Sequence, residues 1–186
     1  QKIMNNLAIL YEHMGKSEKA DSLLRSLDSE MNLEGIELAN YLNTRAAFFF
    51  AKGELEEALQ LMLDAVQIAD SCISQESIEY SNFLNNLATI YKELRRFEEA
   101  EEVYNKSLIL KENLGIHHPS YLTSLGNLAR LYTDKGDYLR AEAFYLQVNH
   151  SITYLVNKYF PYFNEKEKTN FWNGVKNNAD LFNTFA

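Results

Sequence analysis

The sequence predicts an all-α protein, a right-handed α-solenoid of four helix pairs followed by a closing C-terminal helix. The first observation is a pattern that occurs four times: an alanine, an aromatic residue three positions later, usually a glycine at seven, and a second alanine at twelve. The copies begin at Ala8, Ala46, Ala88 and Ala129, so their starts lie 38, 42 and 41 residues apart. The second observation is composition, because Gly (7) and Pro (2) are scarce whereas Tyr (12) and Phe (11) are plentiful. A repeat of this length with few helix breakers is typical of stacked helix-turn-helix units.

Each copy is expected to form two amphipathic helices, because its apolar residues recur at spacings of three and four. The first helices are expected at residues 2–14, 38–51, 77–94 and 120–135. The second helices, which carry the second alanine, are expected at 17–29, 54–71, 97–113 and 138–158. The four repeats then span residues 1–37, 38–76, 77–118 and 119–158.

Small residues on both helices of a pair allow the two backbones to approach closely, and the aromatic residue at its fixed spacing fills the space beside them. The turn between the helices falls on glycine in three copies and on Arg95 in the third. Gly115 lies where a helix is expected to stop, and Pro119 lies where a first helical turn accepts proline.

The repeat pattern ends near residue 158, and an aromatic linker with a C-terminal helix is expected over 159–186. Pro161 cannot continue a helix, whereas Asn164 followed by Glu167 has the spacing of a capping box. A ninth helix is therefore expected from about Glu165 to Thr184. Because the first residues already lie inside a repeat, we also expect the sequence to be a piece of a longer chain.

Charge and composition exclude several classes of function. A formal net charge of −8 opposes binding to phosphate backbones, so nucleic acid is not expected as a ligand. No apolar run is long enough to cross a membrane. Cys72 is the single cysteine and cannot form an internal disulfide, which favours a reducing, cytoplasmic setting.

The repeats resemble the tetratricopeptide repeat in its kinesin-light-chain-like form, over about residues 1–158. The matching phrases are Asn5-Asn6-Leu7-Ala8, Asn85-Asn86-Leu87-Ala88, Gly126-Asn127-Leu128-Ala129 and Leu114-Gly115-Ile116-His117-His118-Pro119. The second copy departs from the pattern, because Arg45 stands where leucine is expected. We therefore expect less regular packing between the first and second copies. The resemblance implies a fold that binds many different partners.

The tail has a second resemblance. The stretch from Phe160 to Lys168, followed by Phe171-Trp172 and Phe182-Asn183-Thr184-Phe185-Ala186, is similar to the segment that joins tetratricopeptide repeats to a CHAT domain in bacterial proteins. CHAT domains are caspase-like proteases with a His and Cys dyad. This resemblance implies that the chain is the regulatory or sensor arm of a protease whose catalytic domain lies beyond Ala186.

The resemblance also implies where a partner binds, because first helices line the concave groove of such arrays. The expected partner-binding residues are Asn5, Asn6, Asn43, Asn85, Asn86, Thr89, Lys92, Asn127 and Arg130. Further groove candidates are Ile9, Glu12, His13, Ala47, Phe50, Glu93, Thr133 and Asp134. A row of side-chain amides can pair with the N–H and C=O groups of an extended peptide. Alternatively, these amides hydrogen-bond the adjacent repeat and only complete the interface between repeats.

No group of residues predicts catalysis, a cofactor or a metal. None of the four histidines forms an i, i+4 pair on a helix. Cys72 is expected to be a partly buried residue near the end of a helix. The sequence therefore predicts a non-catalytic protein-protein interaction scaffold that binds a peptide or partner protein, with the protease arm as the alternative and no support for an enzyme.

Overall fold

The computed structural model describes residues 33–171 without a break, together with residues 7, 8, 10, 11, 14–16, 18–20, 22, 23 and 173. Most of the expected first helix pair, including Asn5 and Asn6, lies outside the described residues. The chain divides into two compact units, Gln1–Arg96 and Phe97–Ala186. The secondary structure of the described residues is helical, without a β-strand, as the sequence predicts.

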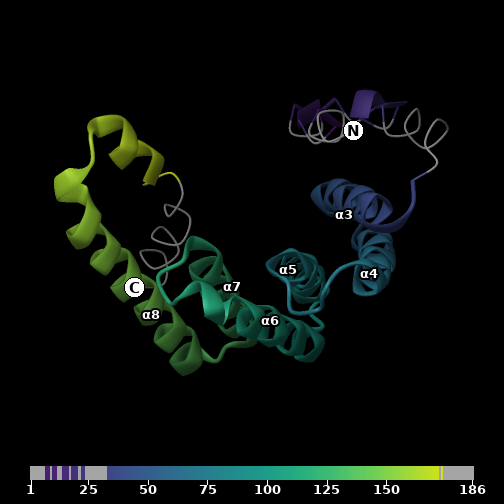
Figure 1. Cartoon of the computed structure of the whole chain (residues 1–186). Coiled ribbons are helices and arrows are strands. Elements are labelled where there is room, and N and C mark those ends of the chain that lie inside the picture. The colour runs from purple at the N-terminus through teal and green to yellow at the C-terminus, as the bar shows by residue number, and fades with distance from the viewer. Residues whose placement is uncertain are drawn as a thin grey trace. The chain divides into compact units, whose positions relative to one another are not determined.

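The described residues of the first unit form the long helices α3 (Gly35–Lys52), α4 (Leu55–Cys72) and α5 (Ile78–Glu93). α4 packs against both α3 and α5 (Figure 1). The Ser77 hydroxyl accepts a hydrogen bond from the backbone N–H of Tyr80 and so caps the start of α5. These helices agree with the expected ranges to within about three residues.

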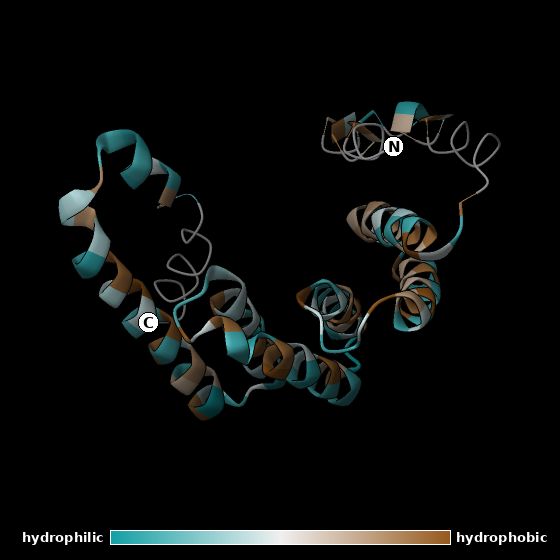
Figure 2. Cartoon of the chain, viewed as in Figure 1, coloured by the Kyte–Doolittle hydropathy of each residue, from teal (hydrophilic) through white to brown (hydrophobic). Residues whose placement is uncertain are grey.

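Alanines of the repeat pattern lie in the core of the first unit. Ala46, Ala58 and Ala88 are at most 1% exposed, which fits their expected role in bringing helices close together. Each helix carries both apolar and hydrophilic residues (Figure 2), and most of the buried residues are apolar or aromatic. The core of this unit therefore follows the register that the repeat predicts.

Arg45, the departure from the repeat pattern, is half-buried among aromatic rings. Its guanidinium carbon lies 6.0 Å from the ring centre of Tyr41 and 5.7 Å from that of Phe49. Cation–π attraction stabilises arginine at such positions. Tyr41 packs in one core cluster with Ala8 of the first copy and Phe48 of the second, so apolar contact between these copies is retained around Arg45.

The second unit contains α6 (Phe97–Lys111), the short 3₁₀ helix η1 (Glu112–Leu114), α7 (Pro119–Lys135), α8 (Tyr138–Tyr159) and the 3₁₀ helix η2 (Phe160–Tyr162). α7 packs against both α6 and α8 (Figure 1). Pro119 occupies the first position of α7, as predicted, and His118 Nδ1 accepts a hydrogen bond from the Ser120 N–H at 3.2 Å. Ala100, Ala129 and Ala141 are fully buried.

The turns inside the helix pairs share one backbone conformation. Gly53 and Gly136 have φ of 80° and 79°, in the left-handed region that glycine adopts without steric cost. Arg95 holds the equivalent position in the third copy with φ of 59°. Its N–H donates to the Lys92 carbonyl at 2.9 Å, so the turn forms despite the side chain. A residue with a Cβ is strained in this region, which makes Arg95 a local cost to stability.

A charged cluster connects α6, α7 and α8 of the second unit. The hydroxyl of Tyr132 donates to Glu101 Oε1 at 2.7 Å, and Lys135 Nζ donates to Glu101 Oε2 at 2.7 Å. Arg140 lies over the Tyr132 ring at 4.4 Å and reaches the same carboxylate at 3.4 Å. Burial raises the pKa of Glu101, but hydrogen bonds from Lys135 and Tyr132 and the nearby cations outweigh it. The pKa of Glu101 is therefore lowered.

Lys111 is buried at the end of α6. Lys111 is 2% exposed, and its Nζ donates a hydrogen bond to the hydroxyl of Ser124 on α7 at 3.0 Å. Burial removes water from the ammonium group and lowers the pKa of Lys111 to about 8. Keeping this side chain charged inside the unit is therefore costly.

The tail begins as the sequence predicts. The Asn164 side chain accepts a hydrogen bond from the Glu167 N–H at 3.0 Å, and the Glu167 carboxylate accepts one from the Asn164 N–H at 2.8 Å, which completes a capping box. Residues 165–171 and 173 are helical, and the rings of Phe160 and Phe163 contact Phe171. The other residues of the expected ninth helix lie outside the described residues.

Candidate functional site

The expected binding residues fall into three groups. Asn43 on α3 and Asn85, Asn86, Thr89 and Lys92 on α5 belong to the first unit. Asn127 and Arg130 are half-buried residues of α7 in the second unit. Asn5 and Asn6 lie outside the described residues. The structure brings two residues of the first group, Asn43 and Asn86, into direct contact.

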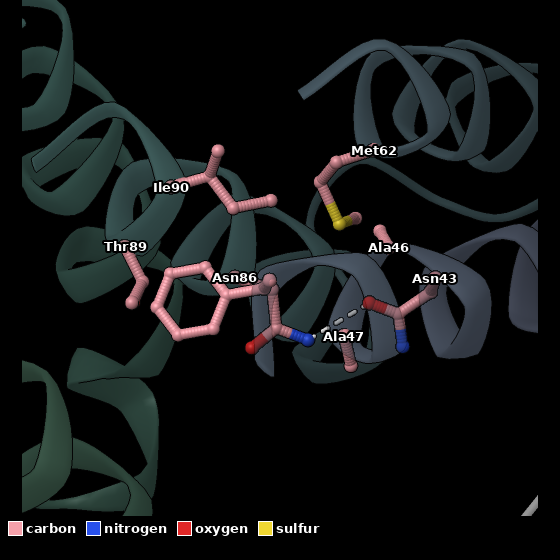
Figure 3. Close-up of a pocket in the computed structure, with 8 residues that line it drawn as sticks. Asn43, Ala46, Ala47, Met62, Asn86, Thr89 and Ile90 are labelled. Atoms are coloured by element: carbon pink, nitrogen blue, oxygen red, sulfur yellow. Dashed lines mark hydrogen bonds between the residues drawn. The ribbon is translucent and has the colours of Figure 1, made fainter. Parts of the chain in front are cut away.

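Asn43 and Asn86 form an amide bridge between α3 and α5. The Nδ2 group of Asn86 donates a hydrogen bond to Oδ1 of Asn43 at 2.9 Å (Figure 3). The two residues are 43 positions apart in sequence and belong to adjacent repeats. This hydrogen bond therefore joins two repeats, as in the alternative in which the asparagines complete the interface between repeats.

The bridge leaves hydrogen-bonding capacity at both asparagines. A primary amide has two N–H donors and a carbonyl oxygen that accepts up to two hydrogen bonds. Within the described residues, Nδ2 of Asn43 and Oδ1 of Asn86 make no hydrogen bond. Asn86 is exposed and Asn43 is half-buried, so both can be reached from solvent. Nδ2 of Asn43 is therefore available as a donor and Oδ1 of Asn86 as an acceptor.

A cavity of about 190 Å³ opens beside the amide bridge. Met62 and Ile90 point toward it from α4 and α5 (Figure 3). Both residues are buried, whereas Ala47 is exposed. No charged side chain belongs to the described lining of the cavity, which consists of Asn43, Ala46, Ala47, Phe50, Met62, Asn86, Thr89 and Ile90. The site is therefore a small apolar pocket with two amides at its edge.

The remaining expected residues of α5 are engaged locally. The Thr89 hydroxyl donates to the carbonyl oxygen of Asn85 at 2.9 Å and lines the cavity. Lys92 is 8% exposed, and its Nζ pairs with the Glu93 carboxylate at 2.5 Å. This ion pair compensates the charge of Lys92, which therefore offers less to a ligand than the amides do.

A family model named Tetratricopeptide repeat matches residues 37–113 and 79–148, which together cover more than half of the sequence. The chain belongs to the tetratricopeptide repeat family. It has no match among curated proteins.

Solved structures have the same fold. BtubC (BKLC) from P. vanneervenii is 23% identical with a TM-score of 0.70, over 98% of this chain and 72% of that one. A putative kinesin light chain with nearly identical TPR-like repeats from Podosopora anserina is 17% identical with a TM-score of 0.69, over 99% and 93%. The pilF protein of Pseudomonas aeruginosa is 19% identical with a TM-score of 0.55, over 98% and 71%. These similarities confirm the predicted class, an all-α solenoid of tetratricopeptide repeats.

Among the described residues of this tetratricopeptide repeat protein, no three His, Cys, Asp or Glu side chains converge as metal ligands would. The ring of His117 stacks on Tyr154 at 4.1 Å. Cys72 ends α4 as predicted, but the prediction that it is partly buried is wrong, because it is exposed. None of the described helices is both long and apolar enough to cross a membrane.

The sequence did not single out Met62 and Ile90 as residues of the site. Both lie on faces that the repeat assigns to the core, Met62 four residues after Ala58 and Ile90 two residues after Ala88. A core residue lines a cavity when the helices around it do not close over it. Nothing in the spacing of the repeat indicates where that happens.

Proposed function

We propose that the chain is a non-catalytic protein-interaction scaffold that binds an extended peptide segment of a partner protein along its asparagines. The observation that carries the proposal is the Asn43–Asn86 bridge, which offers an open donor and an open acceptor at the mouth of a cavity. Asn85, Thr89 and Lys92, with Asn5 and Asn6, are proposed as further contacts in the first unit, and Asn127 and Arg130 are proposed as contacts in the second unit. Membership of a family whose members generally act as binding scaffolds supports the same function.

Side-chain amides suit the backbone of a peptide. An extended segment presents N–H and C=O groups in alternation, and an amide can satisfy either of them without reading the peptide side chains. Because no charged side chain belongs to the described lining of the cavity, we expect binding at this point to depend little on electrostatic attraction. We therefore expect the affinity to survive moderate salt, whereas binding dominated by ion pairs would weaken.

The experiment selects random-sequence peptides displayed on phage against the wild-type protein and compares affinities of the enriched peptides for variants. The double variant Asn43→Leu, Asn86→Leu removes both amides, and Asn82→Leu is the matched control. Asn82 is an exposed asparagine on α5, one turn before Asn86, and does not line the cavity. The loss of hydrogen bonds to buried peptide groups should weaken binding by about tenfold or more in the double variant alone.

Circular dichroism is measured on all three proteins, so that a loss of helix is recognised. Equal affinity of the wild type and the double variant for every enriched peptide would place binding elsewhere on the protein. Failure to enrich any peptide would contradict the proposed function as a whole.

The protease arm is a second candidate function. The capping box at Asn164 and Glu167 and the aromatic contacts of Phe160, Phe163 and Phe171 occur within the segment that resembles the link to a CHAT domain. On this proposal, the tail helix relays partner binding to a catalytic domain. Sequencing the gene after the codon for Ala186 tests it: an in-frame caspase-like domain with His and Cys supports the proposal, and a stop codon ends it.

A further inference from the structure

We infer that the cavity beside the Asn43–Asn86 bridge is a selectivity pocket that takes one uncharged apolar side chain, of about the size of leucine or phenylalanine, from a bound peptide. This inference rests on the proposed function and adds a sequence preference to it. Amides alone would bind any extended backbone, whereas a pocket for one side chain restricts which peptides bind.

The size of the cavity indicates a single side chain as the occupant. Pockets for drug-sized small molecules measure roughly 300–1,000 Å³, whereas this cavity measures about 190 Å³. An apolar cavity of roughly 150 Å³ in another protein holds one benzene molecule. The space is therefore suited to a leucine, methionine or phenylalanine side chain and is too small for a cofactor of nucleotide size.

The lining of the cavity indicates an apolar occupant. Met62 is 1% exposed and Ile90 is 3% exposed, so the inner side of the cavity is closed to water by hydrocarbon and a thioether. Methionine adapts its shape to different neighbours, which allows the pocket to accept more than one apolar residue. An aspartate or lysine side chain placed there would lose its hydration without gaining a partner of opposite charge.

The position of the amides relative to the cavity couples the recognition of backbone and side chain. Asn43 and Asn86 line the cavity that their bridge borders, so groups bound to them lie next to its opening. A carbonyl oxygen of the peptide backbone can accept from Nδ2 of Asn43 while a backbone N–H donates to Oδ1 of Asn86. A side chain of the same short segment then enters the cavity, which fixes the register of the peptide.

Filling the cavity tests the inference. Ala47 lines the cavity and is exposed, so Ala47→Leu places new carbon atoms at its opening without overpacking the core. The matched control is Ala51→Leu, because Ala51 is an exposed alanine one turn further along α3 and is not part of the lining. The probes are the phage-selected peptides and the blocked amino acids N-acetyl-leucine, N-acetyl-alanine and N-acetyl-aspartate methylamide.

The expected result has three parts. The enriched peptides share an apolar residue at one position, and replacing that residue with alanine weakens binding about tenfold. Ala47→Leu weakens the same peptides about tenfold or more, whereas Ala51→Leu does not. In NMR titrations at millimolar concentration, the leucine derivative shifts the side-chain amide signals of Asn43 and Asn86, and the alanine and aspartate derivatives do not.

The outcomes separate this inference from the proposed function. If enriched peptides bind through the asparagines but tolerate Ala47→Leu and share no apolar position, the pocket inference is wrong and the amide-based function stands. If binding is lost in Ala47→Leu but unchanged by replacing Asn43 and Asn86, a side-chain pocket exists without backbone pairing, and the coupling inferred here is overturned.

Discussion

Replacing Lys111 with methionine should raise the free energy of unfolding of the second unit at pH 7. Methionine has a similar length to lysine but no charge, so it can occupy the buried space at the end of α6 without the cost of dehydrating an ammonium group. The only interaction that the structure gives Lys111 Nζ within the described residues is the 3.0 Å hydrogen bond to Ser124, whose hydroxyl also donates to the Ser120 carbonyl.

The magnitude follows from the lowered pKa. The pKa of Lys111 is about 8 in the folded protein and 10.5 ordinarily, and this difference corresponds to roughly 3 kcal/mol of cost to the charged form. Loss of the hydrogen bond to Ser124 takes back about 1 kcal/mol. The net gain at pH 7 is therefore about 2 kcal/mol.

The pH dependence provides a second measure of the same effect. Because the folded-state pKa is lower than the unfolded-state pKa, the unfolded protein binds more protons between pH 8 and 10.5, and stability rises with pH across that window. The cost is fully present below about pH 8 and disappears above about pH 10.5. The advantage of Lys111→Met over the wild type should therefore shrink as the pH rises from 8 toward 10.

Urea unfolding followed by circular dichroism at pH 7 and pH 10 measures both quantities. Lys106→Met is the control, because Lys106 is an exposed lysine on the same helix. If Lys111→Met is less stable than the wild type at pH 7, or if its gain in stability is the same at pH 10 as at pH 7, then the buried charge of Lys111 does not cost stability.

Three further predictions concern packing, backbone and charge. Ala88→Leu should lower the free energy of unfolding by about 1–3 kcal/mol because Ala88 is fully buried, whereas Ala51→Leu should not because Ala51 is exposed. Equal melting temperatures of Ala88→Leu and the wild type would count against the repeat register. Gly136→Ala should cost about 1 kcal/mol in urea unfolding through its φ of 79° alone, because an added Cβ contacts nothing within 4 Å; an unchanged midpoint would contradict this. Because the pKa of Glu101 is lowered, its contribution to stability is present above pH 4.5 and is lost as the pH falls through the folded-state pKa. Glu101→Gln should therefore be less stable than the wild type at pH 7 and should lose less stability on acidification. If the free energies of unfolding of the two proteins change in parallel with pH, the cluster does not have this role.

Much of the fold could be predicted from the sequence because the repeat fixes a helical register. The spacing predicts a helix over 77–94 where α5 spans Ile78–Glu93, and Pro119 begins α7 as its fixed φ requires. The capping box at Asn164 and Glu167 was also predictable, because both partners are local in sequence. Features that depend on spacings of three and four residues are therefore accessible from the sequence alone.

Features that depend on contacts between helices were not accessible in the same way. Lys111 is buried because it continues the inner face of α6 that begins with Ala100 and Tyr104, a register that predicts burial but conflicts with the usual exposure of lysine. The repeat places Arg95 at the turn position that glycine holds in the other copies, but arginine itself disfavours the left-handed conformation that it adopts there. The cavity depends on how far α3, α4 and α5 stay apart around Met62, which no single helix specifies.

An NMR titration of the ¹⁵N-labelled protein tests most directly whether the amides of Asn43 and Asn86 bind the backbone of a partner peptide. An unlabelled phage-selected peptide is added, and the side-chain Nδ2 signals of both asparagines are followed. Both signals should shift and should saturate with the Kd measured independently for the same peptide. Saturating binding that leaves both signals unmoved would contradict this prediction.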